Sequence, residues 1–260
     1  MTLEPLQYVL GAFSGVLVGF VLGLVGGGGS ILAVPLMVYL VGVKSPHLAI
    51  GTSALAVAAN AATGLTNHAR AGNVKWRCAL VFAVSGIAGA AIGSTLGKAF
   101  DGQKLLFLFA LVMIAVGILM LRRRSHAGDP EVSLGRQNAG KLVAYGVGAG
   151  LFSGFFGIGG GFLIVPGLIA ATGMPMLNAV GSSLVAVTSF GLTTAANYAI
   201  SGLVDWALAF VFVVGGLLGS FAGTRSAKHL SGAGHLTTVF AGLIFAVAAY
   251  MLWKSAGQAF

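Results

Sequence analysis

Charged residues are scarce in this 260-residue chain, in which Asp, Glu, Lys and Arg make up 7% of the residues and hydrophobic residues 57%. The mean hydropathy of +0.99 lies far outside the range of water-soluble domains. Because a membrane-spanning helix needs about 20 predominantly apolar residues, the length leaves room for roughly eight to ten hydrophobic segments joined by short loops. The composition excludes an additional soluble domain of ordinary size and predicts an all-α polytopic membrane protein.

Acidic residues are scarcer still, and all five fall in loops or near segment ends: Glu4, Asp101, Asp129, Glu131 and Asp205. Proton and sodium coupling often depend on carboxylates inside the membrane. Coupling in this chain would therefore have to use His68, backbone carbonyls or no ion at all. Transport without a coupling ion is physically allowed, because an inside-negative potential drives anion exit by about 2.3 kcal/mol per charge per 100 mV.

Motifs of common enzymes are missing as well. The sequence has no GxxxxGK[ST] loop, no HExxH and no GxSxG, and no recognisable protease motif surrounds Ser53 and His68. The single cysteine, Cys78, cannot form an internal disulfide and has no Cys or His cluster at metal-ligand spacing beside it. We predict no enzyme, no cofactor and no metal site. The net charge of +9 is expected to mark loops rather than a nucleic-acid surface.

Glycine, in contrast, is abundant, with 42 residues. Small residues let membrane helices approach closely, so tight helix packing is expected. The apolar segments form two groups of five, near 6–24, 30–43, 47–68, 76–97 and 103–121, then near 142–156, 161–173, 177–200, 206–225 and 236–253. We predict a first membrane repeat at 1–121, a polar connector at 122–141 and a second membrane repeat at 142–260.

The two groups are related in sequence, which indicates an internal duplication. GLVGGGGSILAVP at 23–35 aligns without a gap with GFFGIGGGFLIVP at 154–166. After one deletion, NHARAGNVKW at 67–76 matches NYAISGLVDW at 197–206. In the same register, Gly51, Ser53 and the glycines at 86, 89 and 93 match Gly181, Ser183 and the glycines at 216, 219 and 223.

Basic residues predict the orientation, since cytoplasmic loops carry an excess of Lys and Arg. With five crossings per half, ten basic residues lie on the connector side and four (Lys44, Lys98, Lys104 and Lys254) lie opposite. The connector is therefore predicted to be cytoplasmic and the N-terminus extracytoplasmic. An odd number of crossings also inverts the second half, giving two inverted-topology repeats. Segments 30–43 and 161–173 are short, so we expect broken or re-entrant helices at the glycine runs.

The two glycine runs are the candidate solute site. They comprise Gly26, Gly27, Gly28, Gly29 and Ser30 in the first half, and Gly157, Gly159, Gly160 and Gly161 in the second. Unwound backbone at membrane depth needs protein or a water-filled cavity around it, and the short helices that follow would aim amide groups at an anion. Tight turns and packing are the alternative explanation. Matched glycine-interrupted segments in both halves favour binding.

Polar residues of the third segment in each half could also contact a solute. We select Ser53, Asn67, Ser183 and Asn197, although Ser, Thr and Asn also bond helices to one another. His68 could relay protons because its unperturbed pKa of about 6.5 lies in the physiological range, or it could be an interfacial residue near Arg70. Arg70 could gather anions or serve as a plain topogenic charge.

The paired glycine segments ending in VP, together with the GTSAL and GSSLVAVT stretches, resemble the TauE/SafE family of sulfite and sulfonate exporters over essentially the whole chain. This resemblance implies a prokaryotic cytoplasmic (inner) membrane and small sulfur-containing or organic anions as substrates. We therefore expect a secondary transporter that exports such anions by alternating access. The alternatives are an anion uptake carrier, a passive anion channel and a membrane scaffold or assembly factor. The expected partners are the lipid bilayer and a small anionic substrate, and a homo-oligomer is compatible with the sequence.

Overall fold

The protein is an all-α polytopic membrane protein, seen in a computed structural model that describes residues 4–122, 128–129, 132–157, 161–232 and 236–259. No β-strand occurs in these described residues. The helices of the first half are α1 (Pro5–Val25), η1 (Gly26–Leu32), α2 (Ala33–Pro35), η2 (Leu36–Leu40), α3 (Pro46–Arg70), α4 (Trp76–Ala99) and α5 (Gly102–Arg122). Those of the second half are α6 (Arg136–Phe156), α7 (Gly161–Thr172), α8 (Met176–Ile200), α9 (Trp206–Gly232) and α10 (Leu236–Ala259).

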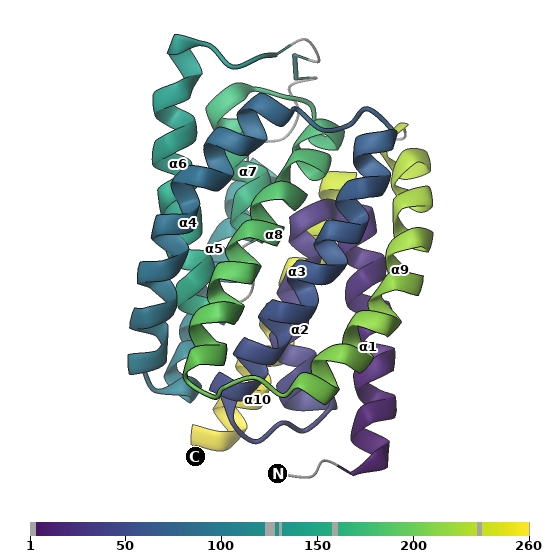
Figure 1. Ribbon diagram of the computed structural model, residues 1–260, viewed down its shortest axis with the longest axis vertical. Coiled ribbons are helices and arrows are strands. Elements are labelled where there is room, and N and C mark those ends of the chain that lie inside the picture. Colours follow the sequence, from purple (N-terminus) through teal and green to yellow (C-terminus); the bar gives the residue numbers. More distant parts are fainter. Residues whose placement is uncertain (1–3, 123–127, 130–131, 158–160, 233–235, 260) are drawn as a thin grey trace.

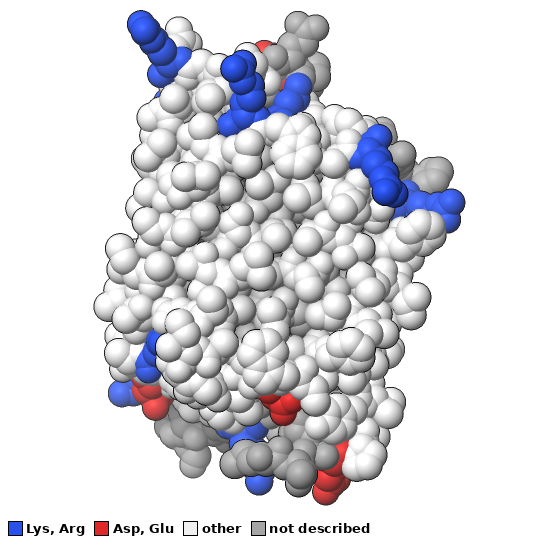
Figure 2. All heavy atoms as spheres, in the orientation of Figure 1, with Lys and Arg blue, Asp and Glu red and all other residues white. Residues whose placement is uncertain are grey.

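The surface of this bundle is suited to lipid. Six helical stretches among the described residues are long and apolar enough to cross a membrane, namely Pro5–Leu40, Pro46–Arg70, Trp76–Ala99, Arg136–Phe156, Met176–Ile200 and Trp206–Ser226. Large apolar side chains such as Phe210, 70% exposed, point outward. Figure 2 shows a broad uncharged band between two ends that carry the Lys, Arg, Asp and Glu side chains of that face. The chain is therefore a multi-pass membrane protein.

Both glycine runs lie at the bends of helical hairpins. The Gln7 side chain near the start of α1 donates to the carbonyl of Val41 at 2.9 Å, so the chain between them returns to the end from which α1 departed. In the second half, the Asp129 amide donates to the carbonyl of Gly173 at 2.9 Å, which brings the end of α7 back beside the connector. In Figure 1 the two termini lie at one end of the bundle and the connector at the other.

The first hairpin is irregular because its residues cannot sustain an α-helix. Gly26 ends α1 with φ +64°, a left-handed conformation that only glycine adopts readily. The following glycines form a 3-10 helix, and a π-helical turn follows Pro35, whose nitrogen has no hydrogen to donate. Gly157 ends α6 with a positive φ as well, +68°, in the left-handed helical region.

Helices α1 and α9 pack along a seam of glycines with their backbones in contact. A β-carbon added to Gly15, Gly19 or Gly23 would overlap the carbonyl oxygens of Phe212, Gly216 or Ser220, respectively. From the other side, Gly215, Gly219 and Gly223 meet the carbonyls of Ala12, Val16 and Phe20. Residues this small allow the closest packing open to two helices.

Helices α4 and α6 form a second seam of the same kind. Gly146, Gly150 and Gly154 of α6 meet the carbonyl oxygens of Phe82, Gly86 and Ala90, while Gly89, Gly93 and Gly97 of α4 meet those of Val147, Leu151 and Phe155. Each seam thus joins one helix that precedes the connector to one that follows it. Helices α3 and α8 lie between the seams and pack on each other. Helix α3 also packs on α9, and α8 packs on α4. Helix α5 packs on α10.

The α4–α6 seam yields a stability prediction with an internal control. Gly150→Leu would force side-chain atoms into the Gly86 backbone, so we expect the free energy of unfolding to fall by about 1–3 kcal/mol, the usual cost of overpacking. A β-carbon added at Gly148, two residues away on the same helix, has no neighbouring atom within 4 Å, so Gly148→Leu is expected to leave the free energy of unfolding nearly unchanged. Thermal unfolding of both purified variants in detergent measures the difference, and equal melting temperatures would contradict the seam.

Candidate functional site

The two glycine runs meet in the interior of the bundle. A β-carbon on Gly161, the first residue of α7, would overlap the carbonyl oxygen of Gly27, and one on Gly27 would lie 2.8 Å from the α-carbon of Gly161. All residues from Gly26 to Ile31 are buried. The two halves of the chain therefore touch here backbone to backbone, at a point closed to solvent in this conformation.

Two serine hydroxyls join these backbones. The amide of Gly27 donates to Ser183 Oγ at 2.9 Å, and that hydroxyl donates to the carbonyl of Val180 at 2.7 Å. Ser30 Oγ donates to the carbonyl of Gly27 at 2.8 Å and accepts from the amide of Gly161 at 3.3 Å. These bonds give hydrogen-bond partners to amides and carbonyls that no regular helix pairs, and an unpaired amide is costly within a membrane. The groups involved are neutral, and α7 directs the positive end of its dipole here.

Each glycine run also rests on the third helix of the other half. Gly26 lies against Val180 and Ser183 of α8, and Gly157 lies against Ile50 of α3. Ser53 donates to the carbonyl of Ile50 at 3.1 Å and so stands one turn from that contact. Gly28 and Gly29 are buried, whereas Gly159 and Gly160 lie outside the described residues.

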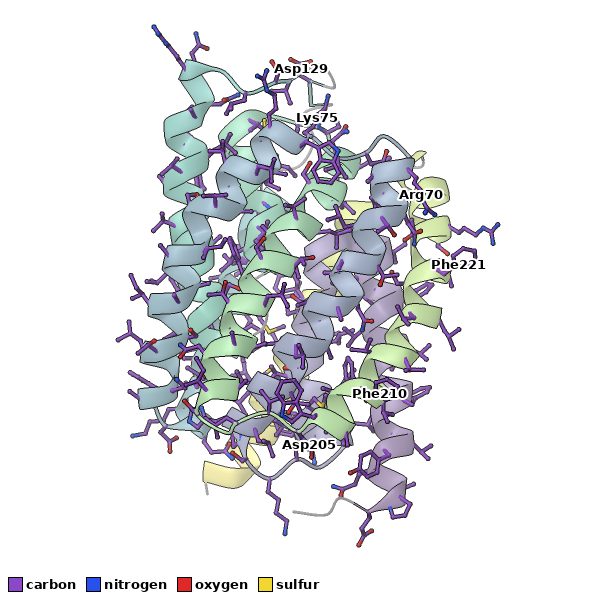
Figure 3. The ribbon with its side chains drawn as sticks, viewed as in Figure 1. Arg70, Lys75, Asp129, Asp205, Phe210 and Phe221 are labelled. Atoms are coloured by element: carbon purple, nitrogen blue, oxygen red, sulfur yellow. The ribbon has the colours of Figure 1, made fainter. Side chains whose placement is uncertain are left out.

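The structure separates Asn67 from Asn197. Helices α3 and α8 run in opposite directions, so Asn67 lies near the Arg70 end of the bundle and Asn197 near the other (Figure 3). The Asn197 amide nitrogen donates to Ser94 Oγ at 2.6 Å and to Thr95 Oγ1 at 3.0 Å. Its side-chain oxygen accepts from Lys98 Nζ at 2.8 Å. In this conformation Asn197 bonds α8 to α4.

His68 lies inside the bundle, with 1% of its surface exposed. Its Nε2 is 3.2 Å from the carbonyl oxygen of Gly23 on α1, and its Nδ1 is 3.4 Å from the amide nitrogen of Asn73. Arg70 is exposed at the end of α3, two residues further on (Figure 3). The two predicted relay residues therefore differ in surroundings, because the ring faces α1 and the guanidinium faces outward.

A sequence profile described as "Sulfite exporter TauE/SafE" matches residues 11–251. The chain belongs to the sulfite exporter TauE/SafE family. This TauE/SafE chain is 53% identical, over 98% of both sequences, to a "probable membrane transporter protein" of Xylella fastidiosa strain 9a5c. It is 27% identical to "probable membrane transporter protein YunE" of Bacillus subtilis, covering 84% of this chain and 88% of the relative. A relative of the same description in Methanocaldococcus jannaschii is 30% identical over 68% of each chain. No solved structure matches this family member.

Sequence reasoning missed Lys98 in this TauE/SafE chain, because it treated that residue as a loop charge. Lys98 is half-buried at the end of α4, and its ammonium donates to Asn197 Oδ1, to the carbonyl of Asn197 at 3.0 Å and to Ser201 Oγ at 2.8 Å. A signal was present in the sequence: Lys98 and Lys228 are equivalent positions in the alignment of the two halves.

Two loop-docking bonds were missed as well. The amide of Lys75, just before α4, donates to Ser182 Oγ of α8, and the amide of Asp205, just before α9, donates to Thr52 Oγ1 of α3, both at 2.9 Å. These four residues form two equivalent pairs in the internal alignment. Thr52 and Ser182 therefore anchor loops to the central helices in the conformation seen here.

Proposed function

We propose that this family member is a secondary transporter of small organic or sulfur-containing anions, of the sulfite, sulfonate and thiosulfate class, and that it exports them by alternating access. The observation that carries the proposal is the buried meeting of the glycine runs at Gly27 and Gly161. When the runs separate, the amides of Gly27 and Gly161 and the hydroxyls of Ser30 and Ser183 become free to donate to the oxygen atoms of an anion. Neutral donors would bind such an anion less tightly than a positively charged side chain, so the anion could also be released.

The two halves are proposed to be inverted repeats around this site. In support, α3 and α8 run antiparallel, as do α1 and α6 (Figure 1). The paired bonds of Lys75 with Ser182 and of Asp205 with Thr52 also recur in matching positions. Inverted repeats that enclose a midplane site are a recurrent architecture of secondary transporters.

The packing of the helices changes which bodies are expected to move. Rocking of one whole half against the other would break both glycine seams, because each seam joins a helix of the first half to a helix of the second. We propose instead that α1 moves together with α9 and that α4 moves together with α6. The central helices α3 and α8 lie between these two pairs. Movement of either pair relative to the central helices would expose the glycine site to one side of the membrane.

We propose that the connector end is cytoplasmic and that the membrane is the cytoplasmic membrane of a prokaryote. Arg70 and Lys75 lie at the connector end, whereas Asp205 lies at the opposite end (Figure 3). This distribution follows the rule that cytoplasmic loops carry the positive charge. In this orientation the membrane potential drives an anion outward, so export needs no carboxylate within the membrane.

Counterflow tests this proposal. Liposomes that contain the purified protein and unlabelled sulfite are expected to accumulate labelled sulfite transiently, and added sulfonates or thiosulfate should compete. Saturation and counterflow identify a carrier, because a passive channel shows neither. Sulfite flux no greater than in empty liposomes, for protein that elutes as a single species in detergent, would contradict sulfite transport; the same result for sulfonates and thiosulfate would contradict the proposed class.

A further inference from the structure

Asn60 lies at the middle of α3, and its side-chain amide has no hydrogen-bond partner in the part of the chain that the structure describes. The side chain is fully buried, and neither its Nδ2 nor its Oδ1 has a hydrogen-bond partner among the described residues. The amide lies against the backbone of Gly216 on α9, where a β-carbon would overlap it. Asn60 therefore occupies the interface between a central helix and the α1–α9 pair.

A second polar group without a partner lies one turn along the same interface. Ser220 of α9 is fully buried, and its Oγ has no hydrogen-bond partner within the described part of the chain. This oxygen lies 3.3 Å from the position that a β-carbon on Gly64 would occupy. Gly64 follows Asn60 by four residues and Ser220 follows Gly216 by four, so each pair lies on one face of its helix. The α3–α9 interface thus carries two orphaned polar groups in adjacent layers.

In the corresponding interface between α8 and α4, the position equivalent to Asn60 is apolar, although the hydroxyl of Thr194, one turn further along α8, is also buried without a hydrogen-bond partner among the described residues. The same separation of 130 residues that relates Gly86 to Gly216 relates Asn60 to Phe190. Phe190 lies against Gly86 and stacks on Phe82, with ring centroids 6.4 Å apart and planes inclined by 26°. An apolar side chain therefore fills this position well, so packing against a glycine does not require an amide.

An amide or hydroxyl buried without a partner destabilises the conformation that buries it. In a protein that alternates between conformations, this cost is explained if the group finds its partner in another conformation. The partner would enter when α9 separates from α3. It would have to accept from an amide N–H and a serine O–H, which suits the oxygen atoms of a small oxyanion.

We infer that Asn60 and Ser220 form a second solute contact, at which the oxyanion is held between α3 and α9 on its way to or from the glycine site. The inference rests on the proposed function and deepens it. It assigns the solute route to the α3–α9 interface, where the Asn60 amide lies, rather than to the α4–α8 interface, where Phe190 stacks on Phe82 at the equivalent position.

Cysteine labelling tests the route. Because Cys78 is the chain's one cysteine, Cys78→Ala gives a cysteine-free background into which Asn60→Cys or Phe190→Cys can be placed separately. Position 60 is expected to react with a membrane-permeant maleimide at least tenfold faster than position 190. Isethionate, a sulfonate that does not react with maleimide, should slow labelling at position 60 and leave that at position 190 unchanged. Equal rates at the two positions, or no protection by isethionate, would overturn the inference.

Flux distinguishes failure of this site from failure of the proposed function. Asn60→Leu and Ser220→Ala should each lower counterflow about tenfold or more at subsaturating solute, whereas Asn60→Gln should recover part of it because it restores the amide; Phe190→Leu should remain within about twofold of the unchanged chain. Normal flux in Asn60→Leu overturns the second contact and leaves transport intact. Absence of flux in the unchanged chain instead overturns the proposed function.

Discussion

Gly161→Leu is expected to reduce anion counterflow to the level of empty liposomes. The new side chain would occupy the position of the Gly27 carbonyl, so the two glycine runs could no longer meet. The amide of Gly161 would be displaced from Ser30 Oγ, and the neutral donors that we propose for the solute would lose their arrangement. Gly161→Ala should have a smaller but clear effect, because even one methyl group overlaps the backbone opposite.

Loss of flux is informative only when the variant is folded. Gly148→Leu serves as the matched control, since the same side chain is added at a glycine where a β-carbon would have no neighbouring atom within 4 Å. Both proteins should elute as single species in detergent, and flux through Gly148→Leu should equal that of the unchanged chain. Full activity of a correctly inserted Gly161→Leu protein would show that the solute does not depend on the glycine runs.

Lys98→Met is expected to lower the free energy of unfolding by about 1.5–3 kcal/mol, the usual range for hydrogen bonds to a charged group. The ammonium donates three bonds that fasten α4 to the end of α8, and methionine replaces its length without its donors. If this fastening also keeps the bundle closed at that end, the variant should be more accessible to water-soluble reagents there. Thermal unfolding in detergent measures the first effect directly.

Lys104→Met is the control for charge alone, because Lys104 is exposed near the same end of the bundle. Its removal should leave the free energy of unfolding nearly unchanged, as expected of a surface charge. Asn197→Ala should also lower the free energy of unfolding, because it removes the amide's bonds to Ser94 and Thr95 and one of the three acceptors of the Lys98 ammonium. Equal stability of Lys98→Met and Lys104→Met would mean that the bonds of Lys98 contribute nothing measurable.

Much of the fold could be predicted because hydropathy directly reports which residues face lipid or a protein interior. The segment predicted at 76–97 is the helix Trp76–Ala99, and the glycine runs interrupt the helices where the sequence indicated. The predicted helix ends were less accurate where small polar residues continue a helix. Helix α9 extends to Gly232, beyond the predicted end at 225. Hydropathy falls there, but the backbone hydrogen bonds of a helix do not depend on it.

Helix partners could not be predicted in the same way. The spacing of Gly15, Gly19 and Gly23 indicates a helix face that another helix can approach closely. It does not indicate which helix packs there, because a glycine has no side chain that would select a partner. Asn197 illustrates the same limit at the candidate site, because an amide can contact a solute or another helix. The structure shows that the Asn197 side chain contacts another helix, because Lys98 of α4 donates to its oxygen. In the sequence Asn60 is one of several polar residues of its segment, and its lack of a hydrogen-bond partner among the described residues is a property of the folded chain.

The glycine seams have a consequence for how the protein is made. During synthesis α1 enters the membrane early, but α9, its partner along the seam, comes almost at the end of the chain. Until then the glycine face of α1 lacks its partner helix. The glycine face of α4 likewise lacks its partner until α6 has been synthesised. The connector divides the sequence in two without separating two folding units. We therefore expect a product that stops at the connector to be recognised as incomplete and degraded, so the membrane would contain the finished bundle or none of it.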